Sequence, residues 1–318
     1  MFAPWRVATL AFLVVAIPLQ AQHRNRKTQG DYSDGSDFTL DTTVAMSRSG
    51  SVDLQSFSGD VKVVAWDRDE VKVHGKSRNE IHFDASPSRV SLTENPGDHG
   101  DDDHVDMGRS YGFEISVPKS ARLVIRSISG DIQVHDVADV EAHTVSGDLN
   151  ATNIASHADF ETVSGDLSVT NAAAGLRAST VSGDIQARKI TGEVSAQSVS
   201  GDVVLEDVTS SFVRSETVSG EVHFTGPVDP KGRYEFHSHS GDVDLDLTGG
   251  TGDATLDVET YSGDLDTGCA MTLQPGGRGD RMGKRGTLTM GNGGGAHFVL
   301  KTFSGDVHIR GCRSHGDK

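Results

Sequence analysis

One short phrase recurs through this chain at an almost fixed spacing. It reads Ser or Thr, a variable and mostly apolar residue, Ser, Gly, an acid, and then Val, Ile or Leu, as in Thr180–Ile185. Between Gly130 and Gly201 its glycines are 17 or 18 residues apart, and such a fixed period is the signature of a repeat architecture. The corner residues of its ten copies are Gly59, Gly130, Asp131, Gly147, Asp148, Gly165, Asp166, Gly183, Asp184, Gly201, Asp202, Gly220, Glu221, Gly241, Asp242, Gly263, Asp264, Gly305 and Asp306.

One structural repeat can be built from Thr180 to Gln197. Gly183, Gly192 and Gly201 are nine residues apart, so the second half of the repeat imitates the first. This pattern predicts two strands per coil, joined at glycines or at polar pairs such as Arg188-Lys189. Each strand would pair in parallel with its equivalent about 4.8 Å above and below. The side chains expected to fill the interior are Val181, Ile185, Ala187, Ile190, Val194 and Ala196.

These observations predict an all-β fold: a single-chain parallel β-solenoid of about 18-residue coils, preceded by a more irregular β region. No coil could bury its apolar face alone, so stacking would supply the stability. The alternative is an antiparallel meander in which Ser-Gly marks hairpin turns. The constant order and polarity of the phrase favour identical corners lying on identical corners.

Stacked corners would bring the acids into a row about 4.8 Å apart, where neighbouring carboxylates repel by roughly 1 kcal/mol in water. We expect local compensation, with each acid accepting from turn N–H groups and from the neighbouring serine hydroxyl. A row of Ca²⁺ ions is the alternative, although calcium needs six to eight oxygen ligands and the phrase supplies one acid per corner. The glycines are expected where φ is positive or where a Cβ would strike the next coil. A parallel hydroxyl row (Thr144, Thr162, Thr180, Ser198 and Thr217) would stabilise the sheet.

The domain organisation predicted from the rest of the chain begins with a secretory signal at 1–21, with Arg6 before an apolar core and Ala21 at the cut. Its apolar run is too short to span a bilayer, so no transmembrane segment is expected after cleavage. The remaining predicted segments are a flexible linker at 22–37, an N-terminal β region at 38–126 with an exposed acidic loop at 95–110, solenoid repeats at 127–310 with an irregular, exposed, Gly-rich insertion at 267–296, and a tail at 311–318.

Charge and cysteine content narrow the possible partners. The net charge of −17 argues against nucleic acid, whose phosphates need a basic face, and is typical of a soluble sheet protein whose edges are kept apart. The two cysteines, Cys269 and Cys312, suggest one disulfide in an exported protein, with two unpaired thiols as the alternative.

Motifs that carry chemistry are scarce. The sequence contains no Gly-x-Ser-x-Gly, no His-Glu-x-x-His and no phosphate-binding loop. His237 and His239 interrupt the repeat near Gly241 and could form a metal or acid/base pair, but such residues are more often surface or cap residues, which is the interpretation favoured here. Arg278-Gly279-Asp280 spells an integrin-binding tripeptide, which a chain rich in Gly and Asp produces by chance. No catalytic residue and no cofactor are therefore predicted.

The Ser-Gly-Asp corners, Trp66-Asp67 after an early strand, and Ser116-Val117-Pro118-Lys119 leading into Leu123 resemble a bacterial family. It is the exported, adhesin-like family of β-strand repeat proteins, catalogued as a domain of unknown function. The resemblance covers Phe38 to Arg310, and it implies a β-solenoid-like fold in an envelope or secreted protein with no catalytic residues to carry over. The chain departs from it in the insertion at 267–296 and the loop at 95–110.

The function predicted from the sequence is that of a non-enzymatic, adhesin-like scaffold or binding protein, located in the periplasm, the outer envelope or outside the cell. Its sheet faces and loops would contact a surface, glycan or protein. The alternatives are a β-helix carbohydrate-active enzyme, either a polysaccharide lyase or a hydrolase, and a calcium-dependent structural module.

Overall fold

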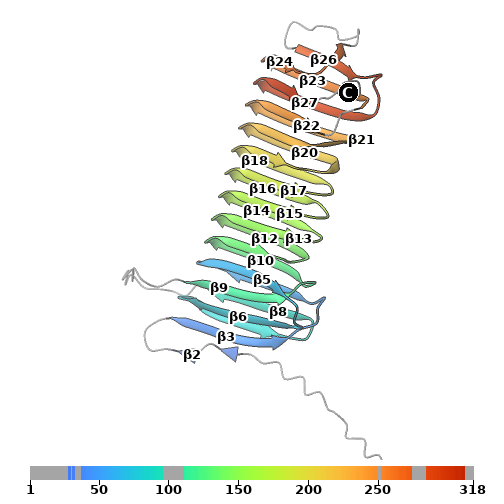
Figure 1. The fold of residues 1–318 in the computed structure, drawn as a ribbon. Helices are drawn as coiled ribbons and strands as arrows, with labels where there is room; N and C mark the ends of the chain where they lie inside the picture. Colours follow the sequence, from blue (N-terminus) through green and yellow to red (C-terminus); the bar gives the residue numbers. More distant parts are fainter. Residues whose placement is uncertain are drawn as a thin grey trace, which may run out of the picture.

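The computed structural model describes residues 28–29, 31–32, 37–95, 111–248, 252–273 and 284–311. Their secondary structure consists of 28 β-strands, and they include no helix that could cross a membrane. The strands stack into one elongated rod, with the N-terminal coils at one end and the C-terminal coils at the other (Figure 1). The all-β solenoid predicted from the repeat is confirmed.

The rod has two sheets. From the N-terminal end, sheet A contains β1 (Thr28–Gln29), β7 (Glu80–Ala85), β8 (Arg89–Asn95), β4 (Ser51–Ser56), β10 (Arg122–Ser129), β12 (Asp139–Ser146), β14 (Ala158–Ser164), β16 (Leu176–Ser182), β18 (Val194–Ser200), β20 (Ser210–Ser219), the second half of β21 (Val222–Ser240), β27 (Ala296–Ser304), β23 (Ala254–Ser262), β26 (Lys284–Met290) and β25 (Met271–Leu273).

Sheet B lies opposite. In the same direction it contains β2 (Asp31–Tyr32), β3 (Phe38–Ala45), β6 (Glu70–Ser77), β9 (Gly112–Pro118), β5 (Asp60–Trp66), β11 (Ile132–His135), β13 (Leu149–Ile154), β15 (Leu167–Ala172), β17 (Ile185–Ile190), β19 (Val203–Glu206), the first half of β21, β22 (Val243–Thr248), β28 (Val307–Arg310) and β24 (Leu265–Thr267).

The central coils pair in parallel and in register. Thr162 of β14 lies beside Thr144 below it and Thr180 above it, and corresponding residues match along both sheets. Antiparallel hairpins joined at Ser-Gly are therefore excluded for the repeats. The register also explains the constant phrase, because each coil offers its neighbour the same backbone groups at the same height.

Of the six side chains predicted to fill the interior of the Thr180–Gln197 coil, all but Val181 lie inside. Those residues are fully buried, whereas Val181 is 46% exposed. The inward position is taken by Thr180, which is 4% exposed. Side chains alternate along a strand, so only one of two neighbours can face inward. Hydropathy alone selected the wrong one, because the buried threonine hydroxyl has a partner inside the corner.

The N-terminal end of the stack departs from sequence order. β4 and β5 lie between β8 and β9 on one side and β10 and β11 on the other. The boundary expected at residue 127 therefore does not separate an irregular region from the solenoid, since two earlier coils belong to the same stack. Within the expected linker at 22–37, the structure describes the short strands β1 and β2. Asn95 ends β8, and the rest of the expected acidic loop lies outside the described residues.

At the C-terminal end too, the stacking order of the coils departs from their sequence order. β27 and β28 come last in the chain, yet they lie between β21 and β22 on one side and β23 and β24 on the other. An irregular excursion was expected at 267–296. Its described residues instead include β25 and β26, which extend sheet A beyond β23 by antiparallel pairing. Among the described residues, antiparallel strands thus close the N-terminal end of both sheets and the C-terminal end of sheet A, whereas sheet B ends on the parallel strand β24. Open parallel edges would otherwise favour further pairing.

The second corner of each central coil uses a non-glycine residue with positive φ. These residues are Asp136, Asn153, Asn171, Lys189 and Asp207, with φ between 55° and 63°. Asn and Asp tolerate this region better than other side chains. Asn171 Nδ2 also donates to Asn153 Oδ1 over 2.7 Å, and Asn153 Nδ2 donates to Asp136 Oδ1 over 2.8 Å. Lys189 is the exception in this row.

Replacing Lys189 by asparagine is therefore expected to stabilise the protein. The variant relieves an unfavourable backbone conformation and lets the new amide donate to Asn171, for a gain of about 1 kcal/mol. Thermal melting should show a rise in Tm for Lys189→Asn and little change for Gln186→Asn, at an exposed position of the same strand. A lower Tm for Lys189→Asn would contradict this account.

Candidate binding site

The repeat glycines form one column along the rod. A Cβ on any member except Gly59 would overlap the carbonyl oxygen of the neighbouring glycine, as Gly183 would with Gly165, whereas a Cβ on Gly59 would meet the Tyr111 carbonyl. The column runs in the order Gly59, Gly130, Gly147, Gly165, Gly183, Gly201, Gly220, Gly241, Gly305 and Gly263. Most members also have positive φ, for example +130° at Gly147. Glycine is therefore required here by close approach of backbones.

The repeat acids form a second row beside this column. The backbone N–H of most of these acids donates to Oδ1 of the acid in the coil before it, for example Asp184 to Asp166 over 2.9 Å and Asp202 to Asp184 over 2.8 Å. The same bond joins Asp131 to Asp60, Asp148 to Asp131, Asp166 to Asp148, Glu221 to Asp202, Asp306 to Asp242 and Asp264 to Asp306. Each acid was expected to accept hydrogen bonds within its own turn. The donors observed are instead backbone N–H groups of the neighbouring coil.

The hydroxyl row completes the corner. Ser198 Oγ donates to the Gly183 carbonyl over 3.1 Å, and Thr217 Oγ1 donates to the Gly201 carbonyl over 3.0 Å. The hydroxyl, the glycine and the acid of the phrase thus each have a structural task. Among the described residues, no three His, Cys, Asp or Glu side chains are grouped as metal ligands.

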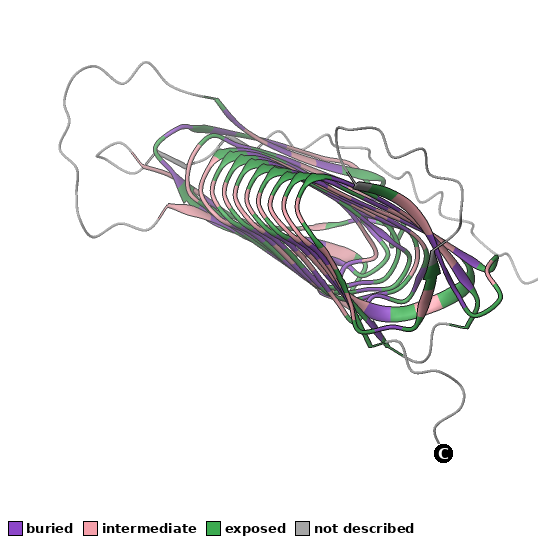
Figure 2. Cartoon of the chain, turned by 90° about the horizontal axis from the view of Figure 1, so that it is seen from above, coloured by how far each residue is buried: buried purple, intermediate pink, exposed green. Residues whose placement is uncertain are grey.

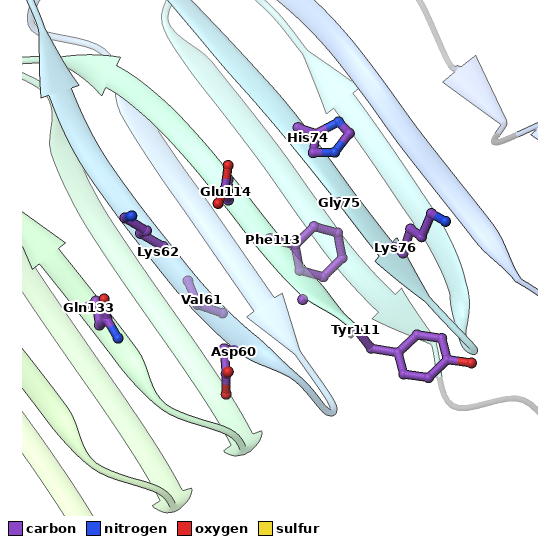
Figure 3. Close-up of a pocket in the computed structure, with 11 residues that line it drawn as sticks. Asp60, Val61, Lys62, His74, Gly75, Lys76, Tyr111, Phe113, Glu114 and Gln133 are labelled. Atoms are coloured by element: carbon purple, nitrogen blue, oxygen red, sulfur yellow. The ribbon is translucent and has the colours of Figure 1, made fainter. Parts of the chain in front are cut away.

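A hollow of about 460 Å³ lies beside the first copy of the repeat, on the outer face of sheet B near the N-terminal end (Figure 3). It forms around Gly112, which pairs with Asp60 on one side and Lys76 on the other and contributes no side chain to this row. The next row across the sheet holds Lys62, Glu114 and His74 on β5, β9 and β6. Gln133 and Tyr111 complete its polar rim.

Several charged groups around the hollow lack an internal partner. Lys62, Lys76 and Glu114 form no ion pair within the described part of the chain. Tyr111 is held in place, because its hydroxyl donates to Asp37 Oδ1 over 3.1 Å and the Arg78 guanidinium lies 4.8 Å from its ring centroid. The site therefore offers donors, acceptors and an aromatic ring to a polar ligand.

Sequence reasoning missed this hollow. Gly112 begins β9, and neither this glycine nor Lys62 and Lys76 belong to the repeated phrase. The sequence signal that could have indicated the hollow is a glycine at the start of a strand, next to charged outward-facing residues. Such a glycine has no side chain and leaves a gap in the surface.

The histidines singled out from the sequence do not form a pair. His237 Nδ1 lies 3.2 Å from Glu216 Oε1, whereas the His239 ring stacks on Phe303 with centroids 4.9 Å apart. Cys269 is disulfide-bonded and nearly buried. Cys312 and the tripeptide at 278–280 lie outside the described residues.

Sheet A carries a charged network on its outer face. Burial by itself would raise the pKa of Glu141, but hydrogen bonds from His143 and Arg122 outweigh it and hold that pKa below its ordinary value. His143 also lies 3.0 Å from Glu161. This arrangement ties neighbouring coils together through ion pairs and does not create a poised acid.

The Toastrack DUF4097 model matches residues 101–267 and again 198–310, which together span about two thirds of the chain. The chain belongs to the Toastrack family. The second match overlaps the first, as expected when a Toastrack model meets an array of near-identical coils, and the matched region contains the whole uninterrupted run of repeats from Gly130 to Gly201. A comparison with curated proteins finds no match.

Two solved structures are similar to this Toastrack chain at low identity. One is a provisionally assigned cell adhesion protein from Clostridium sporogenes, with 8% identity, a TM-score of 0.23, and coverage of 86% of this chain and 99% of that one. The other is a provisionally assigned adhesin from Parabacteroides merdae, with 9% identity, a TM-score of 0.25, and coverage of 70% and 95%.

Proposed function

We propose that this Toastrack protein is a non-enzymatic, adhesin-like binding protein that uses the hollow around Gly112 to contact a polar ligand, either a glycan or the polar face of a partner protein. The observation that carries the proposal is the division of labour along the rod. The repeat residues hold coil to coil, while Lys62, Lys76 and Glu114 surround a hollow without pairing to one another.

The size and chemistry of the hollow support a binding role. Its volume of about 460 Å³ falls within the range of ~300–1,000 Å³ typical of ligand sites. Lysines and carboxylates can hydrogen-bond sugar hydroxyls, and an aromatic ring beside them can stack on a sugar face. The rival enzyme function would need a paired acid and base, and the repeat carboxylates are already bonded to backbone N–H groups.

The location proposed for the protein is the periplasm, the outer envelope or the exterior. The basis is the predicted signal at residues 1–21, with Arg6 preceding the apolar core. Expression in a bacterial host followed by intact-mass measurement should find the chain beginning at Gln22. A mature product that retains Met1–Ala21 would contradict export by cleavage.

The binding proposal is tested with the mature chain on a glycan array and in pull-downs from envelope fractions, with isothermal titration of any ligand found. Lys76→Ala should weaken binding about tenfold or more, because a charge-assisted hydrogen bond contributes ~1.5–3 kcal/mol. Lys72→Ala, on the same strand but outside the hollow, is the matched control.

Turnover separates the two function classes. Binding without release of reducing or unsaturated sugars supports the proposal. Sugar release that is abolished by changing one acid would overturn it in favour of a carbohydrate-active enzyme. A large loss of thermal stability on adding chelator would instead point to a calcium-dependent module.

A further inference from the structure

An exposed apolar row runs along the rod at the position just before each corner serine. We call it the apolar stripe; in stacking order it consists of Phe57, Ile128, Val145, Val163, Val181, Val199, Val218, Phe303 and Tyr261, each 39–50% exposed. His239 occupies the equivalent position in its coil and stacks on Phe303, which in turn stacks on Tyr261 with ring centroids 4.6 Å apart. The exposed segments of successive coils line up along one narrow edge of the stack (Figure 2).

Strand propensity does not explain the stripe. Val, Ile and Phe favour strands wherever they lie, so propensity would act equally on the outward position two residues earlier in each strand. That row holds polar residues instead, for example Ser179, Gln197 and Glu216. The apolar choice is therefore confined to one line on the surface. A continuous apolar line on an otherwise charged protein is typical of an interaction site.

The spacing of the stripe restricts what can cover it. Side chains on one face of an extended peptide recur about every 6.6 Å, and those on a helix recur about every 5.4 Å turn. Stacked coils repeat at the strand spacing of ~4.8 Å, so another β-solenoid stays in step along the whole line. Nine residues of this size at this exposure offer roughly 700 Å² per copy, close to the ~800 Å² per partner of a standard interface.

We propose that the apolar stripe pairs with the same stripe of a second copy of this chain, forming a two-fold dimer whose rods run in the same direction. The acid row, with Asp184 three residues after Val181, flanks one side of the stripe. Rods in opposite directions would set the two acid rows face to face. A two-fold axis along the rods instead places each acid row opposite the partner's sheet A flank, a row of mixed charge in which Arg126 and Lys301 lie among Glu161, Glu216 and Glu259.

The net charge of the chain predicts how this dimer responds to salt. Each copy carries −17, so the two copies repel at long range while the stripe attracts at contact. Added salt screens the repulsion and leaves apolar burial in place. Dimerisation should therefore strengthen as salt rises.

Sedimentation velocity on the mature chain across the micromolar range tests the proposal. We expect a dimer for the wild type, a monomer for Val163→Lys/Val199→Lys, and an unchanged Tm for that variant at low protein concentration. The matched control is Asn150→Lys/Gln186→Lys, which adds the same charge at exposed positions of sheet B and should remain dimeric. A monomeric wild type, or equal dissociation of both variants, would overturn the proposal.

Oxidative cross-linking tests the direction of the rods. In the proposed dimer Val145 of one copy lies opposite Val145 of the other. Val145→Cys should therefore form a covalent dimer under mild oxidation. Gln186→Cys, on the opposite sheet, should not. A dimer that Val163→Lys/Val199→Lys dissociates but that Val145→Cys fails to link would overturn the parallel arrangement. This inference does not depend on the proposed ligand at the hollow.

Discussion

Gly183→Val is expected to unfold the rod at a much lower temperature than the wild type. Its Cβ would overlap the Gly165 carbonyl, and its φ of +154° disfavours a β-branched side chain. The overlapping atom belongs to backbone held on both sides by parallel ladders, so it cannot move aside without breaking them. We expect a loss of roughly 3 kcal/mol or more in the free energy of unfolding.

Ser182→Ala provides the control at the adjacent position. Ser182 is exposed, and surface changes of this kind usually stay within about 0.5 kcal/mol. Circular dichroism melting and urea unfolding should separate the two variants clearly. Because repeat arrays can lose cooperativity, local hydrogen exchange at β16 and β18 is the better measure if unfolding is not two-state. Equal melting temperatures for the two variants would refute the backbone-contact argument.

Phe298→Ala is expected to have the second large effect. Phe298 lies in β27, is fully buried, and stacks on Tyr234 with ring centroids 4.7 Å apart. Truncating a buried phenylalanine typically costs ~3–5 kcal/mol through lost burial and the cavity left behind. Here the loss falls on the strand that joins β21 to β23, so the C-terminal closing strands should loosen together with it.

Phe303→Ala is a stringent comparison for this variant, because it changes the same residue type in the same strand. Phe303 is 48% exposed, and its removal leaves no interior cavity. At a concentration where the chain is monomeric, its Tm should stay close to that of the wild type, whereas Phe298→Ala should melt earlier and expose β26 to proteolysis. Similar losses for both variants would show that the interleaved coil does not organise this end.

The repeated phrase was sufficient to predict the parallel stack and its two strands per coil. A fixed period with constant polarity has few solutions, since each coil must bury its apolar face against an identical neighbour. Ile185 and Val194 were correctly placed inside by alternation within their strands. Val181 was not, because its neighbour Thr180 is polar yet satisfies its hydroxyl within the corner, and a hydropathy pattern does not reveal a hydrogen-bond partner.

Tertiary structure alone decided the order of the terminal coils and the partners of the acids. The sequence places β27 last, but its position between β21 and β23 depends on which long-range pairing buries the most strand edge. The acid row likewise depends on contacts between coils, because the N–H that Asp166 accepts belongs to Asp184, 18 residues away. The hollow at Gly112 arises where β5, β6 and β9 meet. A period determines what repeats along a chain, whereas closing its ends and shaping its surface depend on contacts between segments distant in sequence.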